Sequence, residues 1–219
     1  MAEGVVHISL RDQMLTDQRR DNDGQINQQQ NPTDQIVHSP VLDLLDSERY
    51  FQICVPLRKA ALKGNLKEVY DILEVHEEIL DRSSLLRMAI TKGHATILHV
   101  AAGAGKTSFV EEMINSNSIQ PSNYESTLQL QDLNGNTSFC FAAAAGYVEI
   151  AKIMLGKNRN LTAIHGNHGK TPLYMAVMFG QKEMAAYLYE IPGINLNPDE
   201  RTALFFKSIT TGLYGTYHE

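Results

Sequence analysis

The sequence TPLYMAVMFG, Thr171–Gly180, indicates a repeat protein, because close copies of it recur along the chain. The other close copies are VPLRKAALKG (55–64), TILHVAAGAG (96–105) and TSFCFAAAAG (137–146), and a weaker fifth copy is TALFFKSITT (202–211). Successive copies begin 41, 41, 34 and 31 residues apart. Repeats of this length are typical of helical solenoids, which bury a core between neighbouring repeats and expose one long surface.

Each copy predicts a short helix with its own start and stop. Thr137 and Thr171 can cap a helix by accepting a backbone N–H bond, and Pro172 suits the first turn, where its missing N–H costs nothing. Paired alanines in the middle let a second helix approach closely, and Gly146 can end the helix in a left-handed conformation. The segment YVEIAKIMLGK (147–157) then has the apolar spacing of a second helix. The sequence therefore predicts an all-α solenoid of about four to five helix–turn–helix repeats.

Outside the repeats the composition changes. Residues 1–50 carry four Arg against nine Asp or Glu and are rich in Gln, so we expect a disordered, acidic tail with Pro40–Tyr50 as a candidate capping helix. Residues 51–219 form the predicted repeat domain, with repeats starting near 55, 96, 137, 171 and 202. The connections 81–87 and 115–131 are longer than the others. We expect the polar, Ser/Asn-rich connection 115–131 to be an exposed loop, as a tolerated insertion in preference to a dedicated binding loop.

The overall composition narrows the class of function. The chain has 219 residues and a formal net charge of -6, without the basic footprint of a nucleic-acid-binding protein. Cys54 and Cys140 are the only cysteines and lie outside any metal-binding pattern, which favours a reducing compartment. The N-terminus lacks the pattern of a secretion signal, and the sequence contains no run of about 18 apolar residues. We therefore expect a soluble, cytoplasmic chain that does not itself insert into a membrane.

The repeated phrase resembles the first helix of the ankyrin repeat, T-P-L-H-x-A-A-x-x-G. TPLYMAVMFG and TILHVAAGAG match it closely, and DLNGNTSFCFAAAAGYVEIAKIML (132–155) matches most of a repeat. RKAALKGNLKEVYDIL (58–73) and AITKGHATILHVAAGA (89–104) are similar to a plant ankyrin family whose members continue into a C-terminal Pro-Gly-Gly domain with membrane helices. The resemblance covers roughly residues 51–215. It implies a role in salt-stress, defence, or salicylic-acid or abscisic-acid signalling.

The chain departs from this family in two ways. It contains no Pro-Gly-Gly segment and no membrane helix, so it resembles only the N-terminal soluble half. The fourth position of the phrase is histidine in the ankyrin pattern but is histidine here only at His99, so the inter-repeat hydrogen bond of that residue is in question elsewhere. In the fifth copy Lys207 and Ser208 replace the alanines and Thr211 replaces the glycine. We therefore expect the fifth repeat to fray.

Three patterns suggest other chemistry, and each is the weaker alternative. AGAGKTS (102–108) looks like a phosphate-binding loop, but Val100 stands where the first glycine of GxxxxGK[ST] belongs, and Gly105 is in phase with the helix-ending glycines. His94 and His99 are poorly spaced as metal ligands, so we expect His99 to be a packed, hydrogen-bonded histidine. Cys140 lies among apolar residues and is expected to be buried and inert. We assign no catalytic, metal-binding or cofactor-binding residue and expect a non-enzymatic protein.

The repeat phase indicates where a protein partner would bind. The resemblance to ankyrin folds implies contacts at the tips of the turns and at the outer end of each first helix. Met178 and Phe179 could form a shallow apolar groove, although packing against the fifth repeat is slightly favoured for them. The candidate partner-binding residues are Leu133, Asn134, Asn136, Ala145, Asn167, His168, Lys170, Met178 and Phe179.

The favoured hypothesis is a protein–protein interaction scaffold in plant stress or defence signalling. Its partner is an unidentified protein, and we expect no nucleic-acid or small-molecule ligand. The alternative is a soluble fragment of a membrane-associated ankyrin signalling protein whose transmembrane half is missing, which would lie at the cytoplasmic face of the plasma membrane or an endomembrane. A membrane sensor or channel-like component and a nucleotide-binding enzyme are the other classes considered.

Overall fold

The computed structural model describes residues 50–115, 121–192 and 196–213. The predicted tail and nearly all of the candidate capping helix lie outside these residues. The described residues belong to the unit Ile36–Glu219. The chain begins there with a short π-helix, η2 (Tyr50–Cys54), and ends with a 13-residue helix, α14 (Pro198–Thr210). Between them lie α4 (Val55–Lys63), α5 (Leu66–Val75), α6 (Arg82–Arg87), α7 (Ile97–Gly103), α8 (Thr107–Asn115), α9 (Pro121–Leu128), α10 (Ser138–Ala145), α11 (Val148–Lys157), η3 (Arg159–Ala163), η4 (Asn167–Gly169), α12 (Pro172–Met178) and α13 (Lys182–Tyr189).

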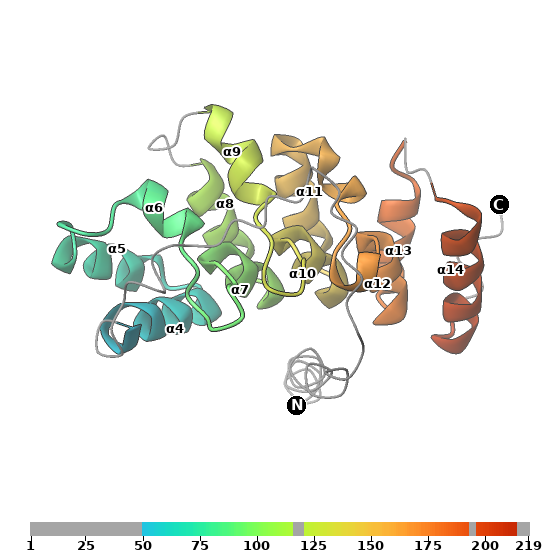
Figure 1. Ribbon diagram of the computed structural model, residues 1–219, viewed down its shortest axis with the longest axis horizontal. Helices are drawn as coiled ribbons and strands as arrows, with labels where there is room; N and C mark the ends of the chain where they lie inside the picture. The colour runs from blue at the N-terminus through green and yellow to red at the C-terminus, as the bar shows by residue number, and fades with distance from the viewer. Residues whose placement is uncertain (1–49, 116–120, 193–195, 214–219) are drawn as a thin grey trace, which may run out of the picture. The chain divides into compact units, whose positions relative to one another are not determined.

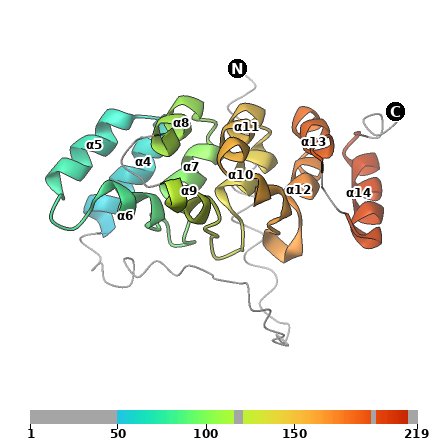
Figure 2. The ribbon, with the colours of Figure 1, turned by 90° about the horizontal axis from the view of Figure 1, so that it is seen from above.

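The helices form two rows. The first helices of the repeats, α4, α7, α10, α12 and α14, follow one another along the unit, and the second helices, α5, α8, α11 and α13, form the other row (Figures 1 and 2). No β-strand occurs in the described ranges, where the loops before α7 and α10 are closed by single bridges. The predicted all-α solenoid is confirmed.

Helices α10 and α12 begin at threonine, as predicted. The hydroxyl oxygen of Thr137 accepts a hydrogen bond from the Cys140 backbone N–H at 3.3 Å, and that of Thr171 accepts one from the Tyr174 N–H at 3.1 Å. Each bond satisfies a backbone donor that the first turn of a helix leaves without an intrahelical partner. Pro172 follows its cap in the first turn of α12.

The first helices also share one way of ending. A glycine adopts positive φ after each of them, and the next residue donates a backbone hydrogen bond to the carbonyl five residues earlier, which is a Schellman motif. At Gly146, where φ is 81°, the Tyr147 N–H donates to the Ala142 oxygen at 3.0 Å. Gly105 has φ 68° and the same bond pattern. Gly105 therefore ends helix α7. In a phosphate-binding loop a strand would precede the glycine, so a helix in this place is incompatible with that motif.

The expected fraying of the fifth repeat is wrong. Helix α14 starts at Pro198 with a capping box formed by Asn197 and Glu200, so Thr202 lies inside the helix rather than at its cap. It ends at Gly212, which has φ 76°, and the Leu213 N–H donates to the Ser208 oxygen at 2.7 Å. The helix-ending glycine is present but comes one residue later than the phrase predicts.

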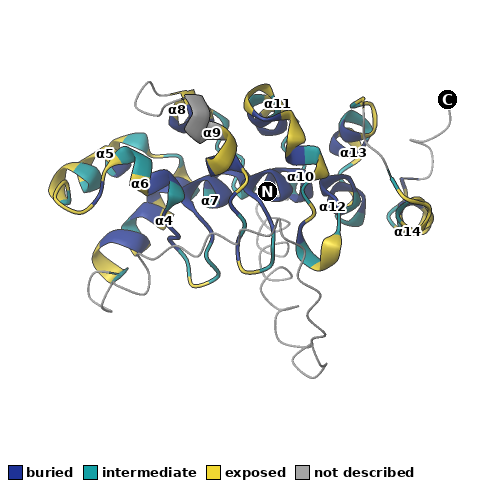
Figure 3. Cartoon of the chain, turned by 45° about the horizontal axis from the view of Figure 1, so that its top comes forward, coloured by how far each residue is buried: buried dark blue, intermediate teal, exposed yellow. Residues whose placement is uncertain are grey.

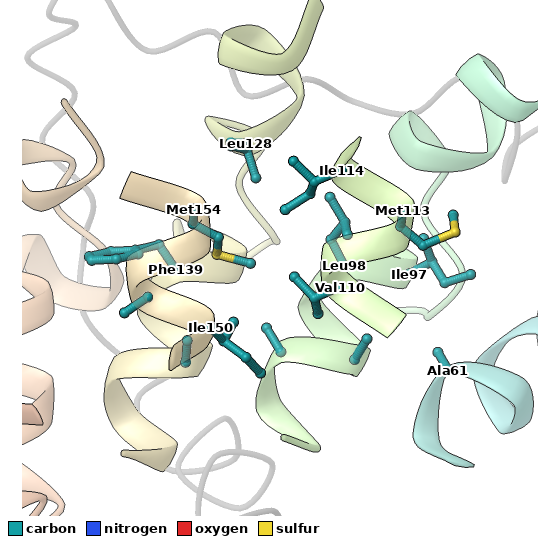
Figure 4. Close-up of a cluster of buried hydrophobic side chains, with 14 of the residues drawn as sticks. Ala61, Ile97, Leu98, Val110, Met113, Ile114, Leu128, Phe139, Ile150 and Met154 are labelled. Atoms are coloured by element: carbon teal, nitrogen blue, oxygen red, sulfur yellow. The ribbon is translucent and has the colours of Figure 1, made fainter. Parts of the chain in front are cut away.

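Both long connections contain a helix, whereas the sequence predicts an exposed loop at residues 115–131. The first contains α6, with Leu85 and Leu86 buried, and the second contains α9, with Leu128 buried. Figure 4 shows the Leu128 side chain near Ile114 of α8. The two insertions also touch one another, because the Arg87 guanidinium donates to the Ser126 hydroxyl at 3.1 Å. Both insertions therefore extend the core.

The core lies between the two rows. Its buried apolar side chains run through the first four repeats and reach Leu204 of α14, and Figure 4 shows part of it between α7, α8, α10 and α11. Ala142 and Ala143 are fully buried, so the predicted small residues do allow close helix packing. Because each repeat packs on its neighbours, this core holds the first helices side by side in register.

Candidate protein-binding surface

One face of the first helices is defined by three positions in each repeat. These are the residues five, two and one places before the helix-ending glycine, which share a face of the helix because they are spaced by three and four. We call this set the inner row. It consists of Lys59, Leu62, Lys63, Val100, Gly103, Ala104, Phe141, Ala144, Ala145, Met175, Met178, Phe179, Lys207, Thr210 and Thr211.

Neighbouring repeats meet within the inner row. A side chain added at Gly103 would lie 3.2 Å from Cδ1 of Phe141, so the glycine leaves room for the ring of the next repeat. The Phe141 ring also packs edge-on against His99, with 5.4 Å between centroids. Phe141 and Val100 remain half-buried, whereas Ala144 and Met175 are buried. The middle of the row is therefore an apolar surface that is only partly covered by the protein itself.

The predicted partner residues divide between this row and the loop tips. Ala145, Met178 and Phe179 are half-buried at the C-terminal ends of α10 and α12. The remaining exposed or half-exposed candidates lie in the loops before those helices, and Leu133 among them is 54% exposed. Figure 3 shows the loops before α7 and α10 extending beyond the helices, with exposed tips. Asn134, in the loop before α10, and Asn167 and Lys170, in the loop before α12, are half-buried, and His168 is exposed.

The prediction that Asn136 contacts a partner at the loop tip is corrected by the structure, because this residue is buried. Its side-chain oxygen accepts a hydrogen bond from the Asn167 N–H at 2.9 Å, which joins the loops of repeats three and four. Its backbone oxygen accepts a second bond from repeat two. With both groups used inside the protein, Asn136 positions the loops and is not part of the exposed surface.

His99 supplies that second bond. Its Nε2 lies 3.0 Å from the Asn136 carbonyl oxygen, which can only accept, so Nε2 carries the proton. Its Nδ1 accepts from the Thr96 N–H at 3.2 Å and from the Thr96 hydroxyl at 2.8 Å. Burial lowers the pKa of His99 to about 4, so the ring is neutral at pH 7. The expected packed, hydrogen-bonded histidine is confirmed.

Between repeats three and four a glutamine and an asparagine hold the loops where histidine is missing. The Gln131 amide donates to the Gly135 oxygen at 2.6 Å and to the His165 oxygen at 3.0 Å. Gly166 leaves space for Asn136, whose Oδ1 would be 2.5 Å from an added side chain. Sequence reasoning missed Gln131, and the only signal was its place just before the turn DLNGN. The loop tips are therefore rigidly placed relative to one another.

Neither cysteine belongs to a reactive site. Cys54 and Cys140 are free and fully buried, and burial raises the pKa of both thiols, to about 11 for Cys54. The Thr137 hydroxyl donates to the Cys140 sulfur at 3.4 Å. A thiol held protonated is a weak nucleophile, which agrees with the expected inert role of Cys140. Among the described residues, His, Cys, Asp and Glu side chains do not gather into a group that could hold a metal ion.

Comparison with known proteins identifies the repeats. The family model for ankyrin repeats (3 copies) matches residues 57–164 and 98–200. Protein ACCELERATED CELL DEATH 6 of Arabidopsis thaliana is 29% identical over 117 residues, which are 50% of this chain and 18% of that protein. A putative ankyrin repeat protein of Rickettsia bellii is 28% identical over 91 residues, 42% of this chain and 52% of that protein. The chain thus spans about half or less of the length of these relatives.

Solved structures show the same fold. A chain in the crystal structure of the yeast ribosomal protein Rps3 in complex with its chaperone Yar1 superposes with a TM-score of 0.58 at 20% sequence identity, covering 70% of this chain and 99% of that one. At this identity the likeness concerns the fold alone. None of the described helices combines the length and the hydropathy that crossing a bilayer requires. Because the family model matches well over half of the sequence, in phase with the structural repeats, the chain belongs to the ankyrin-repeat family.

Proposed function

We propose that this chain is a non-enzymatic scaffold that binds a protein partner through the inner row and the loop tips. The observation that carries the proposal is the half-buried apolar surface formed by Val100, Phe141, Ala145, Met178 and Phe179. A group of five partly exposed apolar side chains on one face of the protein is typical of an interaction site. Ankyrin repeats are interaction modules, so the family supports the same function.

The pathway and the location are finer proposals. The similarity to the Arabidopsis protein supports a role in plant stress or defence signalling, and we place the chain in the cytoplasm. The alternative is that it acts as the soluble part of a membrane-associated signalling protein, at the cytoplasmic face of the plasma membrane or an endomembrane. The observation that supports this alternative is that the matched residues make up only 18% of the Arabidopsis protein. Sequencing the transcript beyond the codon for Glu219 distinguishes the two.

The binding proposal is tested with matched variants of the full chain. Met178→Ala and Phe179→Ala truncate the inner row, and Val75→Ala truncates an exposed apolar residue on the second-helix row. Partners captured from plant extract by the wild-type protein are quantified for each variant by mass spectrometry, and circular dichroism checks that each variant is folded. We expect the inner-row variants to lose the specific partner and Val75→Ala to keep it. Equal capture by all three folded variants would show that the partner binds elsewhere.

A further inference from the structure

Positive charge predominates on the first-helix side of repeats one to four. The first helices of repeats one to four and the loops before them carry Arg58, Lys59, Lys63, Lys92 and Lys170, all exposed or half-exposed. The same segments contain one carboxylate, Asp132, and it is buried. It accepts hydrogen bonds from the backbone N–H groups of its own turn. In repeats one to four this side is therefore positive, although the chain as a whole has a net charge of -6.

The second-helix side carries exposed charges of both signs, and its cations include Lys67, Lys152, Lys157 and Lys182. Every second helix has at least one exposed carboxylate, for example Glu74, Glu111, Glu149 and Glu183. No ion pair within the described ranges involves the three cations of α4, whereas the pairs that do form there lie on or beside the second helices or between the fourth and fifth repeats. Among the described residues, the positive charge of α4 is therefore not neutralised by an ion pair with a carboxylate.

The charge and the apolar surface alternate along the inner row. The row begins with Lys59 and Lys63 in repeat one and reaches Lys207 in repeat five. Between them its positions are apolar in repeats two, three and four. A ligand that fits this order has an apolar centre and negative charge toward its ends. Neighbouring helices pack about 8–10 Å apart, so the four steps from α4 to α14 span roughly 32–40 Å. An extended peptide of about 10–12 residues covers that distance.

We propose that the inner row binds an acidic segment of a partner protein, about 10–12 residues long and extended, with apolar side chains in its middle. This inference rests on the proposed scaffold function and adds the chemistry of the partner. The lysines at the ends of the row attract the carboxylates and set the register, and the apolar centre supplies the buried contact area. A nucleic acid fits less well, because its charge repeats at every phosphate and the middle three repeats of the row offer no cation to match it.

A peptide selection tests the proposal without assuming a partner. A phage library of random 12-residue peptides is selected against the immobilised full chain, and the enriched peptides are synthesised with a fluorescein label. Affinities are measured by fluorescence anisotropy for three proteins: the wild type, the double variant Lys59→Glu/Lys63→Glu, and the control Lys67→Glu/Lys182→Glu. All four lysines are exposed, but the control pair lies on second helices. A 12-nucleotide single-stranded DNA is titrated alongside.

We expect the enriched peptides to contain Asp or Glu on both sides of an aromatic or aliphatic centre. The Lys59→Glu/Lys63→Glu variant should bind them about tenfold more weakly, and the control should bind them as the wild type does. In the wild type, raising the salt from 0.1 M to 1 M should also weaken binding, because the Debye length falls from about 10 Å to about 3 Å.

Three results would overturn the proposal: no enriched peptide, enriched peptides that are neutral or basic, or acidic peptides that bind all three proteins equally. DNA binding as tight as that of the acidic peptides would replace the partner with a nucleic acid. The scaffold function is judged separately. Neutral peptides that lose binding in Met178→Ala and Phe179→Ala would retain the inner row as an interaction site while removing the acidic partner.

Discussion

Truncating the phenylalanine at position 139 should cost far more stability than the same change at position 205, although the two residues occupy one register position. Each stands seven residues before the helix-ending glycine of its repeat. Phe139 is fully buried between the two rows, as are its equivalents in the other first helices of repeats one to four. Phe205 is 61% exposed, because no described helix covers that face of α14.

The burial sets the magnitude of each change. Removing a fully buried phenylalanine side chain typically costs about 3–5 kcal/mol, through lost apolar transfer and the cavity left behind. Phe205 touches the edge of Phe206, with 5.8 Å between ring centroids, and an aromatic contact of this kind contributes about 0.5–1.5 kcal/mol. We therefore expect Phe139→Ala to lower the free energy of unfolding by about 3–5 kcal/mol and Phe205→Ala to lower it by about 1 kcal/mol.

Urea denaturation of the full chain, followed by far-UV circular dichroism, measures both values. In a chain of this size, 1 kcal/mol shifts the melting temperature by about 2–4 °C, so thermal melts give an independent check. A loss of 3 kcal/mol or more for Phe205→Ala would show that the face of α14 is covered in solution. A loss below about 1 kcal/mol for Phe139→Ala would contradict the packing of the core itself.

Three further predictions concern a histidine, two glycines and the thiols. Because the pKa of His99 is lowered to about 4, the unfolded chain binds a proton between pH 6.5 and 4 that the folded chain does not, so stability should fall as the pH drops through this window, by at most about 3 kcal/mol. Urea titrations at pH 7, 5 and 4 should show that the free energy of unfolding depends less on pH in His99→Gln than in the wild type. An equal pH dependence in both proteins would refute the lowered pKa of His99. The raised pKa of Asp132 acts in the opposite direction but is common to both proteins. Gly105→Ala should lower the free energy of unfolding by about 1–3 kcal/mol, because φ is positive there and the new Cβ would lie 2.5 Å from the ring of Tyr147. Gly156→Ala, in open space on α11, should raise it by about 0.5–1 kcal/mol. An unchanged stability of Gly105→Ala in chemical denaturation would contradict the helix-ending role. Both cysteine thiols should react with Ellman's reagent only after unfolding, and rapid reaction of the native protein would mean that one of them is accessible.

The repeated phrase predicts what depends on local backbone chemistry. Thr137 and Thr171 cap their helices, and Gly105 ends α7, because capping bonds and positive φ involve only neighbouring residues. The helices α6 and α9 were missed, since RSSLLR and PSNYESTL are too short and too polar to show a helical period. They form because the rest of the fold offers apolar surface to their leucines.

The binding surface was predictable only in part. Met178 and Phe179 follow from counting back to the glycine, but Val100 and Phe141 become visible only when the helices lie side by side. Asn136 has the composition of an exposed turn, and its burial depends on a loop 31 residues further along the chain. In the fifth repeat the glycine comes one residue later than the phrase predicts, so counting from Thr202 gave the wrong register.

The proposed scaffold function requires that partners bind the inner row rather than the second helices. Methyl NMR spectra of the full chain, recorded with and without a selected 12-residue peptide, test it most directly. Signals from Val100, Ala145 and Met178 should shift on binding, while those of Val75 and Ile79, on the second-helix side, should stay in place. Shifts confined to Val75 and Ile79, with the inner-row signals unchanged, would contradict it.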